Sequence, residues 1–302
     1  MEGILLLRKI LLYSLIFILS ACSSTAEGGR LLTDAESVML SRLDSDQLYA
    51  TIQELTQEPR VAGTESERQA AEFLTTQLEQ YGYVVDVNTF TIEGTKNESQ
   101  NLIVTKKTTD DLPSTDDIIM IGAHYDSVVQ SPGASDNASG TAVLLEVARM
   151  LKDKPTSSEI RFIFFGSEEH GLAGSESYVN EMTINEIERT IAMFNLDMVG
   201  SADAGPLTMF TVDGMPNTAT EISNKANESL FGEALLLKST GQSDHLPFHI
   251  AGIPAVLFSY FPLEKTYHSA NDTIDKLSEQ RLENIAHIIA IAVFGLTTLG
   301  SE

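Results

Sequence analysis

The segment EIRFIFFGSEEHGLAGS, residues 159–175, passes from an apolar run through two adjacent glutamates into a glycine-rich turn. Its first seven residues predict a buried β-strand, and residues 172–182, LAGSESYVNEM, predict a helix. Glu168 and Glu169 therefore lie at the tip of a strand, where their like charges repel each other. Because cations would compensate both carboxylates, the pair suggests a strand end that binds positive charge.

Strands and helices alternate along the rest of the chain. Strands are predicted over residues 83–92, 100–107, 117–128, 160–165, 189–200, 207–213 and 254–260. Helices are predicted over residues 34–56, 63–83, 140–153, 172–182, 217–230, 244–252 and 278–299. This alternation indicates one domain over residues 35–302, an α/β fold with three α/β/α layers and a mostly parallel mixed central sheet flanked by helices.

Two of the predicted helices begin with capping signals. Thr64 and Glu67 have the spacing of a capping box, and Gly82 is expected to end that helix. In the segment GQSDHLPF, Ser243 or Asp244 is expected to cap a short helix, with a role beside the site as the alternative.

The first 22 residues, MEGILLLRKILLYSLIFILSAC, have the pattern of a secretory signal: a basic pair, a short apolar run and small residues. The sequence LSAC resembles the lipobox of bacterial lipoproteins, which predicts cleavage before Cys22 and lipid attachment to this single cysteine. The alternative is an ordinary signal that is cleaved nearby. We expect a lipoprotein signal peptide over residues 1–21 and a flexible tether over residues 22–34. The protein would be exported and anchored by its lipid to the outer face of the plasma membrane, or to an outer membrane where one exists.

The charge balance excludes one class of partner. The chain has 43 acidic and 19 basic residues, a net charge of −24. Nucleic acid binding needs clustered Lys and Arg, so we expect no nucleic acid partner. The acidic surface keeps the protein soluble through self-repulsion, and part of the acidity can serve cations.

Polar residues that can ligate metal follow several of the predicted strands. Each has an ordinary structural explanation, such as an N-cap or a turn, but five strand-end loops supply them, and such ends meet at one edge of an α/β sheet. The candidates are His124, Asp126, Asp136, Glu168, Glu169, Asp197 and His268.

Imidazole and carboxylate ligands without cysteine suit zinc or a similar divalent ion. Two imidazoles and three carboxylates fit two metal ions if one carboxylate bridges them. His124 and Asp126 share one face of their strand, so Asp126 can hold the second ring nitrogen of His124. Since successive residues point in different directions, Glu169 can bind metal while Glu168 faces the water as general base.

The motifs GAHYDS, SDNASGTA, FFGSEEHGLAGS, NLDMVG and YHSANDT, in this order, resemble the co-catalytic di-zinc aminopeptidases of the secreted bacterial leucyl aminopeptidase type. The resemblance extends from about Pro59 to the end of the chain and implies a zinc exopeptidase fold of the phosphorylase/hydrolase-like kind. It implies two Zn²⁺ ions, peptide substrates with a free N-terminus, and a cis peptide bond between Asp136 and Asn137. We also expect a monomer.

The resemblance also implies a role for each motif residue. One zinc would be bound by His124 and Asp197, and the other by Glu169 and His268, with Asp136 as the bridge. Glu168 would be the general base and then the acid that protonates the leaving amine, while Tyr267 would donate a hydrogen bond to the oxyanion. The specificity pocket is expected in residues 207–212 and 239–261.

Three alternatives remain open. Glutaminyl cyclases use one zinc on this fold, and the resemblance implies that they keep a tryptophan beside the reacting ring. This chain has no Trp. A second group of two-metal peptidases and deacylases inserts a lid domain, for which the 71 positions between Asp197 and His268 leave little room. The third is an inactive, lipid-anchored binding protein, which would not need the base Glu168.

Overall fold

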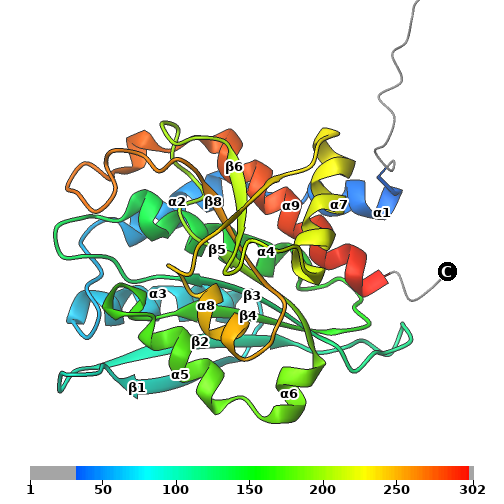
Figure 1. The fold of residues 1–302 in the computed structure, drawn as a ribbon, viewed down its shortest axis with the longest axis horizontal. Coiled ribbons are helices and arrows are strands. Elements are labelled where there is room, and N and C mark those ends of the chain that lie inside the picture. Colours follow the sequence, from blue (N-terminus) through cyan, green and yellow to red (C-terminus); the bar gives the residue numbers. More distant parts are fainter. Residues whose placement is uncertain (1–31, 299–302) are drawn as a thin grey trace, which may run out of the picture.

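The computed structural model describes residues 32–298, in which eight strands form a single mixed sheet with the order β1-β2-β4-β3-β5-β8-β6-β7 (Figure 1). The strands are β1 (Val85–Thr91), β2 (Glu98–Lys106), β3 (Ile118–His124), β4 (Glu159–Phe165), β5 (Thr190–Leu196), β6 (Leu207–Thr211), β7 (Leu236–Ser239) and β8 (Ala255–Tyr260). The helices are α1 (Asp34–Leu40), α2 (Ser45–Leu55), α3 (Glu65–Gln80), α4 (Gly140–Leu151), α5 (Ala173–Glu181), α6 (Ile184–Arg189), α7 (Thr218–Phe231), α8 (His245–Ile250) and α9 (Glu279–Thr298).

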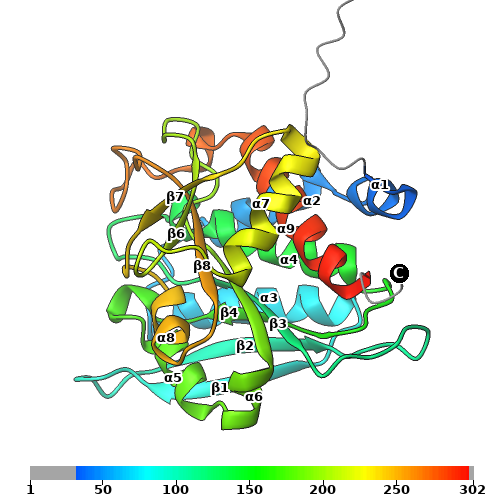
Figure 2. The same cartoon turned by 45° about the vertical axis from the view of Figure 1, so that its right-hand side comes forward.

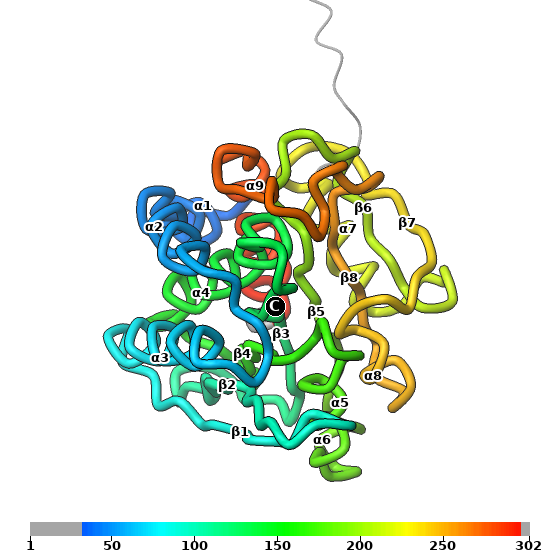
Figure 3. The backbone as a smooth tube through the Cα atoms, turned by 90° about the vertical axis from the view of Figure 1, so that its left-hand side faces the viewer, coloured from blue at the N-terminus to red at the C-terminus, as the bar shows by residue number. Residues whose placement is uncertain are grey.

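Helices cover both faces of the sheet, which confirms the predicted three-layer α/β/α class (Figures 2 and 3). One face packs against α2, α3, α4, α7 and α9, and the other against α5, α6 and α8. Every residue of β3 is buried, as expected for a central strand covered on both sides.

The four central strands β4, β3, β5 and β8 are mutually parallel, so their carboxyl ends meet at one edge of the sheet. Of the four other pairs, β1 with β2, β2 with β4, and β6 with β8 are antiparallel, whereas β6 with β7 is parallel. The sheet is therefore parallel where the candidate ligands lie and mixed toward both of its edges.

The first predicted helix is wrong as a single element. The chain forms α1 and α2, with a break between them at Ser41 to Asp44. Asp44 is the N-cap of α2, because its carboxylate accepts the backbone N–H of Gln47 at 3.0 Å. The backbone N–H of Asp44 donates to Glu146 Oε1 at 2.7 Å. Helix α6 and strand β7 were not predicted.

The capping box at the start of α3 is also wrong, although Thr64 is the N-cap residue. The Thr64 hydroxyl donates to Val61 O, and Glu67 accepts from Gly63 N and Ser99 Oγ, both at 2.6 Å. Burial outweighs these bonds and raises the pKa of Glu67 to about 7.

Residues 1–31 lie outside the described part of the chain, so the signal peptide, Cys22 and most of the tether stay predictions. Between residues 32 and 298, no helix combines the length and the apolar character that crossing a membrane requires.

The buried Glu67 predicts a pH dependence of stability. Its pKa is higher in the folded chain than in the unfolded chain, so folding favours its protonated form, and the penalty for ionising it grows between about pH 4.5 and 7. We expect Glu67→Gln to gain stability relative to the wild type as the pH rises from 4 to 8, by up to about 3 kcal/mol. Urea unfolding at both pH values measures this difference. Glu72→Gln, an exposed position on the same helix, is the control; an equal pH response of both variants would contradict the prediction.

Candidate metal centre

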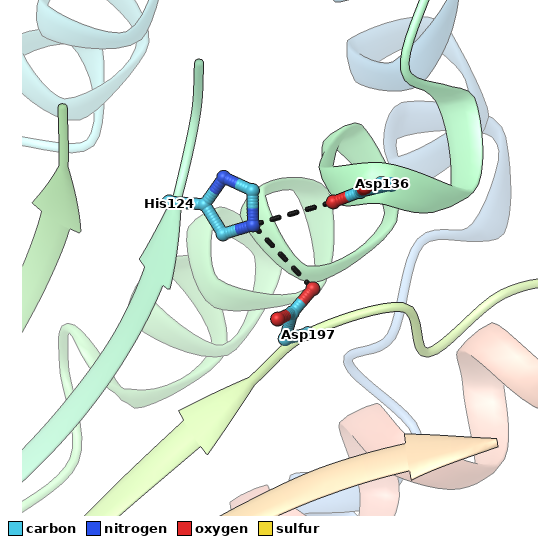
Figure 4. A group of neighbouring side chains, drawn as sticks. All are labelled: His124, Asp136 and Asp197. Carbon is cyan, nitrogen blue, oxygen red and sulfur yellow. Dashed lines mark ion pairs between the residues drawn. The ribbon is translucent and has the colours of Figure 1, made fainter. Parts of the chain in front are cut away.

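His124, Asp136 and Asp197 form one group of potential ligands (Figure 4). His124 is the last residue of β3, Asp197 follows β5, and Asp136 lies in the irregular helical turn Ala134–Ser139 before α4. The Nε2 atom of His124 is 3.4 Å from Asp136 Oδ1 and 3.4 Å from Asp197 Oδ1. Three strand-end segments therefore direct their ligand atoms toward one point.

A second group consists of Asp136, Glu169 and His268. Glu169 lies in the turn after β4, and His268 lies in the loop after β8. His268 Nε2 is 3.0 Å from Asp136 Oδ2 and 3.0 Å from Glu169 Oε2. Asp136 thus belongs to both groups, with one carboxylate oxygen facing His124 and the other facing His268.

The donor atoms fit a metal site because they are buried and lack ordinary partners. Within the described residues, both ring nitrogens of His124, Asp197 Oδ1, Glu169 Oε1 and His268 Nε2 are buried without a hydrogen bond. Such atoms carry a large desolvation cost unless something binds them. Nitrogen and oxygen donors in this combination suit Zn²⁺.

The electrostatics of the protein groups favour a bound cation. Burial, reinforced by the neighbouring charge of Asp136, raises the pKa of Glu169 to about 8. Burial also opposes ionisation of Asp136, but contacts with the two imidazoles prevail and lower its pKa to about 2. Divalent cations would stabilise both carboxylates in the ionised form.

Asp126 connects two of the segments that supply ligands. Its Oδ1 is 3.4 Å from His124 Nδ1, on the side of the ring away from the other ligands. The same carboxylate accepts the backbone N–H groups of Glu168 at 3.0 Å and Glu169 at 3.2 Å. A fully buried Asp126 therefore holds the glutamate turn against the end of β3.

The backbone is strained beside the ligands. Four non-glycine residues of the described chain have positive φ, and three of them lie at the site: Ser167 before Glu168, Met198 after Asp197, and His268 itself. Such conformations persist where the surroundings enforce them, and they concentrate at functional sites.

Asp272 supports the turn that carries Asp136, and sequence reasoning did not identify it. Its carboxylate accepts the backbone N–H groups of Ser135 at 2.7 Å and of Asp136 at 3.1 Å. The peptide bond between Asp136 and Asn137 is cis, as the family resemblance implied. The Asn137 side chain then donates to Leu196 O at 2.8 Å, which ties this turn to the end of β5.

Arg60 is a second residue that was missed. Its buried guanidinium donates to the carbonyl oxygens of Leu55, Tyr125, Pro132 and Gly133 at 2.6 to 2.9 Å. Burial lowers its pKa to about 10. This one cation therefore holds the loop between the end of β3 and the turn of Asp136. In the sequence, Arg60 is a single basic residue before a short run of small residues, and this pattern does not indicate such a role.

The cap assigned to Ser243 or Asp244 is wrong. Asp244 is fully buried at the start of α8 and makes no side-chain cap. The Ser243 hydroxyl donates to Asp197 Oδ2 at 2.8 Å and accepts a hydrogen bond from Asn195 Nδ2 at 2.7 Å. Burial raises the pKa of Asp244 to about 7, and its charge interacts with His124 and Asp197. The segment supports the site instead of capping a helix.

A cleft of about 570 Å³ opens beside the ligands. Asp136, Glu168, Glu169 and Asp197 line the part at the ligand groups, which we call the inner part. The rest of the lining, which we call the outer part, contains residues of the two regions expected to form the specificity pocket, including Phe210, Leu257 and Phe261. Tyr267 also lines the cleft, and its ring stacks on His268 with centroids 3.8 Å apart.

Comparison with known proteins agrees with this geometry. Residues 101–293 match the model of peptidase family M28. Aminopeptidase YwaD of Bacillus subtilis (strain 168) is 43% identical over 207 residues, which cover 66% of this chain and 45% of the relative. The probable lipoprotein aminopeptidase LpqL of Mycobacterium tuberculosis (strain ATCC 25618 / H37Rv) is 31% identical over 221 residues, 61% of this chain and 43% of the relative. The chain thus spans less than half the length of these two curated relatives.

Solved structures match nearly the whole fold. An aminopeptidase from Aneurinibacillus sp. strain AM-1 superposes with a TM-score of 0.83 at 30% identity, covering 87% of this chain and 96% of that one. BSAP, a zinc aminopeptidase from Bacillus subtilis, gives a TM-score of 0.79 at 27% identity, covering 84% and 95%. All of the predicted ligands lie within the matched residues 101–293, and the chain belongs to peptidase family M28.

Proposed function

We propose that this chain is a zinc-dependent aminopeptidase that removes N-terminal residues from peptides with two metal ions. The observation that carries the proposal is the shared Asp136 carboxylate, which faces one ligand group with each oxygen. The zinc aminopeptidase among the similar structures supports the choice of metal. His124 and Asp197 would hold one ion, Glu169 and His268 the other, and Asp136 both.

Bound zinc would polarise the peptide carbonyl and acidify a water molecule. The chain's own contribution begins with Glu168, which lines the cleft with its Oε2 4.0 Å from His124 Nε2. Glu168 accepts a proton from the attacking water and passes it to the leaving amine. Asp126 positions Glu168, because its carboxylate binds the backbone N–H of that residue. Asp126 also orients the His124 ring.

Tyr267 would stabilise the oxyanion. Burial and the surrounding carboxylates raise its pKa, so the phenol stays protonated and can donate a hydrogen bond. Its side chain is 42% exposed at the cleft, where a substrate would cover it.

Carboxylates in the cleft explain the preference for a free N-terminus. Glu168 and Asp197 line its inner part and can accept hydrogen bonds from a substrate ammonium group. This arrangement favours an aminopeptidase, because a carboxypeptidase needs a cation for the terminal carboxylate beside the metal ligands, where the lining groups are carboxylates. The single-zinc glutaminyl cyclase is the second candidate, and the number of bound metals separates the two.

Export and lipid anchoring through Cys22 belong to the same proposal. The name of the LpqL relative, a probable lipoprotein aminopeptidase, supports them. The monomeric state stays a prediction.

Metal analysis tests the shared carboxylate. We expect two zinc ions per chain in the wild type, about one in His268→Ala, and loss of both in Asp136→Ala, because only Asp136 serves both groups. Elemental analysis after dialysis against trace zinc measures the ratio. His170→Ala, at an exposed position beside the glutamates, is the control and keeps two ions. One zinc in the wild type would favour the cyclase.

Glu168→Gln tests the general base. It keeps the size of the side chain but removes the proton acceptor, so kcat for leucyl-p-nitroanilide should fall by about 10²–10⁴ while the zinc content stays at the wild-type value. Glu176→Gln, exposed on α5, should retain wild-type kcat. Unchanged turnover in Glu168→Gln would remove Glu168 from the mechanism, and an inactive wild type would favour the binding-protein alternative.

Fractionation of cells that express the full chain tests the anchor. We expect the wild type in the membrane fraction and Cys22→Ala outside it, because one lipidated cysteine supplies the attachment. Incorporation of radioactive palmitate is the second measurement, and we expect label in the wild type and none in the variant. A wild type that is unlabelled and recovered away from membranes would favour an ordinary signal peptide.

A further inference from the structure

The outer end of the cleft lies across the sheet edge formed by β6 and β7. The strand register places Leu257 of β8 opposite Phe210 of β6, and Phe210 opposite Lys238 of β7. Paired residues project on the same face of a sheet, and all three line the cleft. The preceding residues Met209 and Leu237 pack into the core on the other face. Lys238 therefore belongs to the cleft wall.

The Lys238 ammonium group is available to a ligand. It lies over the ring of Phe261, 4.4 Å from the centroid, and Phe261 packs edge-on against Phe210 at 5.5 Å. Among residues 32–298, no carboxylate forms an ion pair with Lys238, although the chain has 43 acidic residues. An aromatic face stabilises a cation without neutralising it.

Three polar residues that follow Lys238 in the chain can also donate hydrogen bonds in the cleft. Ser239, Thr240 and Gln242 line the same part of the cleft, and within the described chain their side chains make no hydrogen bonds. Lys238 is the single Lys or Arg among the described residues that line the cleft. The four lining carboxylates lie at the inner end, where two divalent ions would balance them. The outer end thus keeps a positive charge with neutral donors beside it.

We propose that Lys238 binds a carboxylate of the substrate and gives the enzyme a preference for acidic substrates. This inference rests on the proposed aminopeptidase function. Lys238 lies on the third strand from β5, whose end carries Asp197, so three strand spacings of about 4.8 Å separate the two backbones. Side chains and substrate fill this gap of roughly 14 Å. The carboxylate can belong to the side chain of the N-terminal residue or to the C-terminus of a short peptide.

Kinetics on the zinc-loaded enzyme distinguish these two sources. One arm compares glutamyl- with leucyl-p-nitroanilide, and the other compares leucylglycine with its C-terminal amide. The measured quantity is the ratio of kcat/KM for the carboxylate substrate to that for its neutral partner. We expect Lys238→Met to lower this ratio about tenfold in one arm, and Lys238→Glu to lower it further. Added NaCl should lower the same ratio in the wild type.

Lys225→Met, exposed on α7, is the matched control and should keep the wild-type ratio. Zinc content and circular dichroism confirm that each variant is folded. An active wild type whose ratios are unchanged by Lys238→Met in both arms overturns the inference and leaves the aminopeptidase function intact. A zinc-loaded wild type that hydrolyses none of the four substrates overturns both.

Discussion

The shared carboxylate of Asp136 is the interaction on which the candidate site depends. Its two oxygens face imidazoles from opposite ends of the site, so the two ligand groups cannot separate without one of them losing a donor. Three further carboxylates line the same cleft. Buried like charges repel strongly, and divalent cations convert this repulsion into attraction. The fold therefore keeps these carboxylates close together, which is unfavourable until cations bind.

Buried charged residues keep this arrangement rigid without being ligands themselves. Asp126 binds the glutamate turn, Asp272 binds the turn of Asp136, and Arg60 binds the loop between the end of β3 and that second turn. All three act on backbone groups. Strand-end loops are otherwise the most mobile parts of a fold, and a site needs its ligands held closely in place. The positive φ values of Ser167 and Met198 indicate that this support outweighs local strain.

In the proposed enzyme, chemistry and specificity would occupy different parts of the sheet. The candidate ligands follow the parallel central strands, where four strand ends meet. The cleft then extends to the mixed edge, where β7 is a short outer strand that carries Lys238. Edge strands pack against fewer neighbours, so their side chains can change without disturbing the core. In the proposed enzyme, this separation would let one metal centre serve different substrates.

The sequence by itself determined the α/β class and the candidate ligands. Hydrophobic periodicity is a local signal, and polar residues directly after apolar strands mark the carboxyl edge of a sheet. Only the tertiary structure decided the break before Ser45, the partners of Glu67 and the roles of Arg60 and Asp244. Asp44 donates to Glu146 and Glu67 accepts from Ser99, in each case across more than 30 positions of the chain. Such contacts form when elements pack, and local residue patterns do not encode which distant group will be adjacent.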